Sequence, residues 1–446
     1  MKKVRIGSGA GYAGDRLKPA LDLMEKGNLD YICFECLAER SIALAQKEKA
    51  ENPELGYNSL LEYRFEKILP LAAEKRVKVI TNMGAANPLS AANRVASMAK
   101  EQNITGLKIA AVFGDDLMPE IDRQMDTILW ETKKPLRELN GTILSANIYM
   151  GAEGIVDALK EGADIVITGR VSDPALFLAP LIYEFQWKLD DWELLGKGTL
   201  VGHLLECGAQ VMGGYFADPG KKDVPDIENI GFPIAEVTED GEFCLTKLPE
   251  AGGCITRETC IEQMVYEIHD PTRYLTPNVT ADFSKVNFEE IGKDIVRVTG
   301  ATGHKRPDTL KVSLGYKDCF IGEGEISYGG PGCVERAKLA EKILKTRFAV
   351  RNLELEECKF DFIGMNSTYW NAKRDYKVPE EIRLRVAART RDKITAKRIG
   401  QEVEALYTNG PAGGCGARQY VREIVSIASL LVERDGTMAQ VRCLEV

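Results

Sequence analysis

The first 190 residues alternate between short apolar runs and longer segments with helical periodicity. Apolar residues that recur every three or four positions favour helices, whereas short apolar runs favour buried strands. Strands are predicted at residues 4–6, 29–34, 77–81, 107–113, 143–149 and 164–168. Helices are predicted at residues 19–26, 38–50, 59–75, 90–102, 154–161 and 174–183. Strands separated by helices predict a mostly parallel sheet, and six such units favour an open, doubly wound sheet over a closed barrel of about eight.

The pattern changes near residue 195, where paired glycines and alternating segments become frequent. Alternation of apolar and polar residues predicts strands, here at residues 295–299, 309–314 and 383–387. Helices are predicted at residues 258–267, 333–347 and 394–406. We therefore predict two domains, an α/β domain at residues 1–195 and an α+β domain at residues 196–446.

The charge balance restricts the classes of partner. The 446 residues include 58 Lys and Arg and 67 Asp and Glu, which gives a net charge of −9. An acidic chain disfavours nucleic acid and anionic membrane as partners, since both need a basic surface. No window of about 18 apolar residues predicts a membrane span, and no apolar signal core follows the N-terminal charges. We expect a cytoplasmic protein whose 11 cysteines are mostly free thiols.

Polar side chains follow nearly every predicted strand of the first domain. Asp15 follows the first strand, Glu39 the second, Asn87 the third and Arg170 the sixth. Ligands of open parallel sheets bind beyond the carboxyl ends of the strands. We therefore predict that the loops after the first, second, third and sixth strands form one pocket, lined by these four residues.

A glycine-rich segment follows the first strand. Gly9, Gly11 and Gly14 match G-x-G-x-x-G, and Glu35 lies at the distance of a ribose-binding acid. Pro19 favours a helix that begins after this loop, whereas a dinucleotide site needs the helix to begin inside it. The sequence therefore disfavours an NAD or FAD site. The backbone of Gly9 and Gly11 remains a candidate for binding a phosphate or carboxylate, and the alternative is a tight turn.

His203 and Glu206 stand three residues apart in a predicted helical stretch. This spacing places both side chains on one face, which suits an acid–base pair, two metal ligands or a structural hydrogen bond. Binding sites favour domain interfaces, so we expect His203 to project from the second domain into the cleft between the domains.

Six stretches together resemble the acyclic terpene utilisation AtuA family. They lie at residues 6–16, 37–40, 168–173, 202–210 (with glycines 213 and 214), 266–271 and 274–277. The resemblance implies an enzyme of organic-acid catabolism that acts on branched acids or their CoA thioesters. Some relatives carry a ferredoxin-like C-terminal extension, which we expect this chain to lack, and some short relatives have a small companion protein.

These observations favour a hydro-lyase or hydratase that acts on a small branched carboxylic acid, for example an unsaturated dicarboxylate, or on its CoA thioester. Such a reaction needs an acid, a base and cations for the carboxylate. The predicted catalytic residues are His203, Glu206, Asp15 and Asp173. The predicted substrate-binding residues are Gly9, Gly11, Arg16, Glu39, Asn87 and Arg170, with Arg16 and Arg170 as the carboxylate clamps.

Several points stay open at this stage. Asp15 and Asp173 are also candidate ligands for a hard divalent metal such as Mg²⁺. A hydrolase or isomerase of the same substrates fits the residues as well, and so does a non-catalytic ligand-binding subunit of a larger complex. We further expect a homo-oligomer and a small companion subunit.

Overall fold

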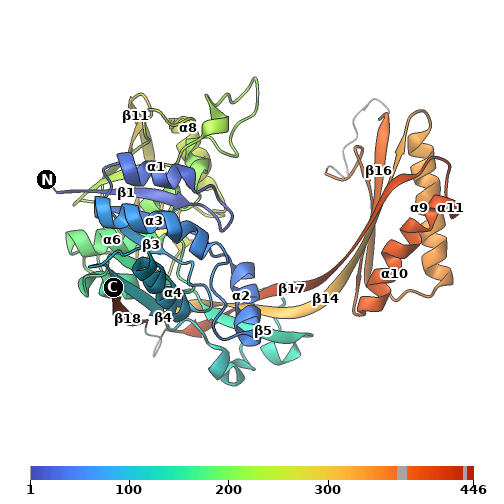
Figure 1. Ribbon diagram of the computed structural model, residues 1–446, viewed down its shortest axis with the longest axis horizontal. Coiled ribbons are helices and arrows are strands. Elements are labelled where there is room, and N and C mark those ends of the chain that lie inside the picture. The colour runs from blue at the N-terminus through green and yellow to red at the C-terminus, as the bar shows by residue number, and fades with distance from the viewer. Residues whose placement is uncertain (1, 369–378, 435–438) are drawn as a thin grey trace. The chain divides into compact units, whose positions relative to one another are not determined.

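The computed structural model describes residues 2–368, 379–434 and 439–446 (Figure 1). The chain forms two compact units. The large unit comprises residues 1–139, 144–315 and 427–446, and the small unit comprises residues 140–143 and 316–426. The division predicted near residue 195 falls inside a helix of the large unit, α7 (Trp192–Leu205). The following 110 or so residues add antiparallel strands to the same sheet, which explains why they belong to the large unit.

A ten-stranded sheet forms the framework of the large unit, in the order β11-β12-β8-β7-β1-β2-β3-β6-β4-β18. Its five central strands are parallel: β1 (Lys3–Ala10), β2 (Tyr31–Phe34), β3 (Lys78–Thr81), β6 (Ile165–Thr168) and β4 (Lys108–Phe113). The flanking strands are antiparallel: β7 (Ile234–Thr238), β8 (Phe243–Thr246), β12 (Ile295–Thr299), β11 (Asn287–Gly292) and β18 (Gln440–Glu445). The α/β class is confirmed, and the sheet is mixed rather than mostly parallel.

Helices cover both faces of the parallel strands, as expected of a doubly wound sheet. In β2, Ile32 and Phe34 pack in one core with side chains of α1 (Lys18–Lys26), α3 (Leu61–Lys75) and α4 (Pro88–Glu101). Cys33 lies between them and faces the other way, where its thiol donates to the Leu176 carbonyl of α6 (Ala175–Phe185). Successive residues of a strand point to opposite faces, so this strand is buried on both sides.

Two predicted strands differ from expectation. Strand β1 continues to Ala10, so Gly9 belongs to the strand rather than to a loop. The strand predicted at residues 143–149 exists as β5 (Thr142–Ile148), but it pairs with β14 (Thr309–Gly329) outside the ten-stranded sheet. An apolar run predicts a strand without naming its partner.

The large unit contains further helices, strands and turns. They are α2 (Glu39–Glu51), α5 (Glu153–Lys160), α8 (Arg257–Val265), a sheet of β13 (Thr302–His304), β10 (Thr280–Asp282) and β9 (Tyr274–Leu275), and the 3₁₀ turns at Met118–Gln124, Leu136–Glu138, Gly208–Met212 and Ile227–Asn229. No helix among the described residues is both long enough and apolar enough to cross a bilayer.

The small unit is an α+β unit whose sheet has the strand order β15-β16-β14-β17, and β5 also pairs with β14. Its elements follow in the order β14, α9 (Cys333–Val350), β15 (Glu357–Ile363), β16 (Glu381–Thr390), α10 (Lys393–Glu404), α11 (Leu406–Asn409) and β17 (Cys415–Glu433). This succession, βαββαβ, is the ferredoxin-like connectivity, so a ferredoxin-like unit is present within the chain. Helices α9 and α10 cover one face of the sheet (Figure 1), where Leu344, Val386 and Ile399 share one core.

Candidate active site

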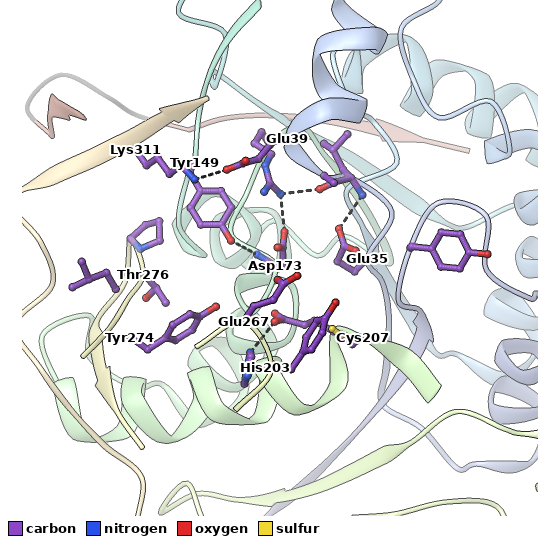
Figure 2. A pocket seen from close by; sticks show the side chains of 18 of the residues that line it. Glu35, Glu39, Tyr149, Asp173, His203, Cys207, Glu267, Tyr274, Thr276 and Lys311 are labelled. Carbon is purple, nitrogen blue, oxygen red and sulfur yellow. Dashed lines mark hydrogen bonds and ion pairs between the residues drawn. The ribbon is translucent and has the colours of Figure 1, made fainter. Parts of the chain in front are cut away.

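A cavity of about 1200 Å³ opens at the carboxyl ends of the parallel strands in the large unit. Its wall includes the segments after β1, β2 and β6, the start of α2 and the end of α7. Residues from 266–277, 307–311 and 427–431 complete the wall, and Figure 2 shows the central part. This is the place where open parallel sheets bind their ligands.

Seven of the ten predicted site residues line this cavity: Gly11, Asp15, Glu39, Arg170, Asp173, His203 and Glu206. Segments far apart in the sequence therefore meet beyond the carboxyl ends of the strands, as predicted for the loops after the first, second and sixth strands. The loop after β3 is the exception, since none of its residues is among the lining. His203 lies on α7, in the same unit as the parallel strands whose ends border the cavity. The expectation that it projects from a second domain is therefore wrong.

The other three predicted residues have structural partners elsewhere. A side chain on Gly9 would begin 2.6 Å from the Phe34 ring, so this glycine allows two strands to pack closely. Asn87 caps α4, and its amide donates to the carbonyls of residues 53 and 55, at 2.8 Å each. The exposed Arg16 donates to the Glu228 carbonyl at 3.2 Å. None of these three residues is among those that line the cavity.

The glycine-rich segment is a packed turn with its own carboxylate. The Gly11 N–H donates to Asp15 Oδ2 at 2.9 Å, and the Arg16 N–H donates to Asp15 Oδ1 at 2.8 Å. A Cβ on Gly11 would lie 2.5 Å from the Cys207 carbonyl carbon. The Asp15 N–H donates to the Tyr12 carbonyl at 3.2 Å, so the segment folds as a turn in which Asp15 occupies the Gly11 N–H.

Arg170 is a cation buried in the cavity wall, with 4% of its surface exposed. Its Nη1 donates to the Leu37 carbonyl at 2.8 Å, to the Val171 carbonyl at 3.2 Å and to Asp173 Oδ1 at 2.7 Å. The guanidinium also lies over the Tyr149 ring, 4.5 Å from its centre. These bonds fix the segment after β2 to the segment after β6, which sets the shape of the cavity floor.

Glu35 follows β2 directly and is an acid of the site whose pKa is raised. Its Oε1 accepts from the Leu37 N–H at 2.9 Å and from Asn82 Nδ2 at 3.0 Å. Burial, together with the nearby Asp173 carboxylate, raises the pKa of Glu35 to about 8. A carboxyl that keeps its proton near neutral pH is a candidate general acid. The sequence indicates Glu35 as a candidate ribose ligand and as the polar end of the second strand, but not as an acid with a raised pKa.

Glu39 has the opposite electrostatic character. It forms an ion pair with Lys311 and lies 3.4 Å from the Ser313 hydroxyl. Burial raises the pKa of Glu39 and the Lys311 ammonium lowers it, and the net shift is downward. Glu39 is therefore an ionised carboxylate that positions a cation at the cavity wall.

His203 and Glu206 form a buried pair at the end of α7. His203 Nδ1 lies 2.9 Å from Glu206 Oε1, as the spacing of three residues predicted, and Nε2 lies 3.0 Å from the Met264 carbonyl. A carbonyl cannot donate, so Nε2 carries a proton, and Nδ1 shares one proton with the carboxylate. Burial raises the pKa of Glu206, and His203 partly offsets this.

The two oxygens of the Glu206 carboxylate differ in their contacts. Glu206 is 8% exposed, and its Oε2 has no hydrogen-bond partner among the described residues. Both ring nitrogens of His203 are engaged. The geometry therefore favours Glu206 as the group that exchanges a proton with a ligand and His203 as its positioning residue.

Three further side chains of the cavity are not among the predicted site residues, although residues 40 and 274 lie in stretches that carry the family resemblance. Tyr149 follows β5, and its hydroxyl accepts from the Asp173 N–H at 3.2 Å. Tyr274 lies against His203, with ring centres 5.4 Å apart (Figure 2). Arg40 lines the cavity with an exposed guanidinium that has no ion pair among the described residues. An unpaired guanidinium at a cavity is suited to bind a carboxylate.

The donors do not form a ready metal site. Among the described residues, no group of three or more His, Cys, Asp or Glu lies close enough to hold a metal ion. Asp15 accepts two backbone N–H groups and Asp173 pairs with Arg170, so both predicted Mg²⁺ ligands have protein partners.

Comparison with known proteins assigns the family. The sequence model described as acyclic terpene utilisation family protein AtuA matches residues 4–443. The chain belongs to the AtuA family. The match covers both units, so the small unit is part of the AtuA-family match, and the family's name indicates a role in catabolism. Searches of the curated proteins and of the solved structures found no match.

His203→Ala tests the buried pair. We expect turnover to fall about 10²–10⁴-fold, because Glu206 loses its positioning partner. The ring is 2% exposed and hydrogen-bonded, so the free energy of unfolding should also fall by about 2 kcal/mol. Steady-state kinetics and thermal melting by circular dichroism measure both. The exposed His304→Ala serves as control, and full activity of folded His203→Ala would contradict the assignment.

Proposed function

We propose that this AtuA-family protein is a hydro-lyase that adds water to, or removes it from, a small branched carboxylic acid or its CoA thioester. The observation that supports this proposal is that two carboxyl groups with raised pKa, Glu35 and Glu206, line one cavity together with cations. Loss of water needs a base for the proton next to the carbonyl and an acid for the departing hydroxyl.

The proposed roles follow from the contacts of each group. Glu206 Oε2 takes the proton from the carbon next to the carbonyl, because it is buried and free of protein partners. Glu35 gives its proton to the departing hydroxyl, since a pKa of about 8 keeps it protonated at neutral pH. Arg40 binds the substrate carboxylate or the thioester's phosphates, and the positive charge of Arg170 stabilises the enolate.

Exchange of hydrogen for deuterium tests the first step. Branched 3-hydroxy acids, their unsaturated counterparts and the CoA thioesters of both are incubated with the protein in D₂O and followed by NMR. We expect deuterium at the carbon next to the carbonyl, together with gain or loss of water. Glu206→Gln should lower the exchange rate about 10²–10⁴-fold.

The controls separate the alternative functions. Glu54→Gln changes an exposed glutamate that does not line the cavity, so it should exchange at the native rate. Exchange without gain or loss of water would favour an isomerase, and hydrolysis without exchange would favour a hydrolase. Binding of these compounds without any turnover would contradict the enzyme proposal in favour of a ligand-binding subunit.

A further inference from the structure

Strand β17 is an edge strand of the small unit's sheet, since β14 is its only neighbour among the strands that the structure describes. The stretch 418–423 of this strand is exposed. The outer backbone groups of an edge strand have no partner in the sheet, so they are a ready template for another strand. Nothing in the proposed reaction uses this edge.

The side chains of β17 alternate between two faces. Gln419 faces α10, since a Cβ on Gly400 would lie 2.4 Å from the Gln419 Cβ, and its amide donates to Glu404 at 3.1 Å. Arg422 faces the other way, where it donates to Glu323 at 3.2 Å. Val421 therefore lies on the α10 side, and Arg418 lies on the open side.

A groove of about 640 Å³ runs between the start of α10 and the edge of β17. Its lining comprises Lys393, Ile394, Lys397, Gln419, Tyr420 and Val421. Ile394 is 63% exposed and Tyr420 is 46% exposed, so apolar surface stands uncovered beside unpaired backbone. Strand addition uses these two features, because the backbone supplies affinity and a side-chain groove supplies specificity.

The charge around the groove is positive, although the chain as a whole is acidic. Lys393, Lys397 and Arg418 have no carboxylate partner among the residues that the structure describes. The neighbouring Asp392 accepts two N–H groups at the start of α10, and Glu404 accepts from Gln419. The groove thus presents uncompensated cations to a ligand.

We infer that the groove and the β17 edge bind an acidic, extended segment of another protein, which adds as a further strand. Its apolar side chains pack on Ile394 and Val421, and its carboxylates, which point to the opposite face, lie beside Arg418. Lys393 and Lys397 border the groove on the α10 side and add to the positive potential that attracts the acidic segment. A second copy of this chain is a poor occupant, because pairing of two β17 edges brings the same cations together across the seam. The inference is independent of the proposed reaction.

Anisotropy of a labelled synthetic peptide tests this inference on the full chain. The probe alternates Val and Glu over about eight residues, a usual strand length. We expect saturable binding that weakens with salt, and no binding of the counterpart that alternates Val and Lys. Lys393→Glu/Lys397→Glu should weaken binding about tenfold or more. Lys338→Glu/Lys342→Glu changes two exposed lysines of α9 at the same spacing and should bind as the native protein does.

Two further measurements complete the test. Hydrogen exchange should show slower exchange of backbone amides within residues 418–422 when the peptide is present, as strand addition requires. Equal binding by both double variants, or no binding by the native chain, would overturn the inference. Light scattering tests whether a second copy of the chain occupies the groove. An oligomer that dissociates only in Lys393→Glu/Lys397→Glu would assign the groove to a second copy and overturn the inference.

Discussion

Glu35→Gln is expected to lower turnover about 10²–10⁴-fold while the protein stays folded. Glutamine keeps an oxygen that accepts from the Leu37 N–H and from Asn82, so the contacts that hold this side chain remain. The variant loses only the proton that the acid delivers. Steady-state kinetics measure the loss, with Glu54→Gln as the matched control, and native turnover of Glu35→Gln would remove Glu35 from the proposed mechanism.

The pH dependence gives this prediction a second readout. The pKa of Glu35 is about 8, so the native enzyme should lose activity as the pH rises through that value and the acid ionises. The residual activity of Glu35→Gln should lack this decline. A native profile without a decline near pH 8 would show that a different group supplies the proton.

The ionisation of Glu35 should also make the free energy of unfolding depend on pH. The folded pKa of about 8 lies above the ordinary value of 4.5, so the folded state holds a proton that the unfolded state releases between these values. The free energy of unfolding therefore falls as the pH rises through this range. Glu35→Gln lacks this loss, and its stability relative to the native protein should increase by about 5 kcal/mol between acid and mildly alkaline pH, at about 1.4 kcal/mol for each pH unit between 4.5 and 8. Urea unfolding across the range measures the difference.

Arg170→Met is expected to lower the free energy of unfolding by about 3–5 kcal/mol, the usual cost of breaking a buried ion pair. The substitution removes the bonds to the Leu37 and Val171 carbonyls and leaves Asp173 without its cation. Urea unfolding of the purified variant checks the value. Arg94→Met is the matched control, because Arg94 forms ion pairs as well, but nearer the surface. Its two carboxylate partners lie at 2.8 and 2.9 Å. Its cost should stay below about 1 kcal/mol.

A double-mutant cycle separates the ion pair from the other contacts of Arg170. Asp173→Asn removes the carboxylate that Arg170→Met leaves unpaired, so the double variant should be more stable than the sum of the single effects predicts by about 1 kcal/mol or more. Additive effects would show that the carbonyl bonds alone account for the role of Arg170. In either case the segment after β2, which carries Glu35, loses its anchor, and activity should not return in the double variant.

The sequence determined the local structure of this chain because local structure has a period. Alternation placed β12 at residues 295–299, and helical spacing predicted α1 and α9 within a few residues of their bounds. His203 and Glu206 were paired correctly for the same reason, since one turn of a helix fixes the distance between them. The polar ends of β1, β2 and β6 indicated the cavity, because parallel strands carry their carboxyl ends to one side.

Only the tertiary structure decided which distant segments meet. Lys311 pairs with Glu39, which is 272 positions away in the sequence. Tyr274, on β9 of the three-stranded sheet, lies against His203 on α7. Both contacts depend on the pairing of β strands, which an apolar run does not specify. The same limit explains Gly9 and Asn87, whose residue types suit a ligand site but which serve strand packing and a helix cap. Burial likewise decided the chemistry of Glu35, because the desolvation that raises its pKa comes from neighbours far away in the sequence.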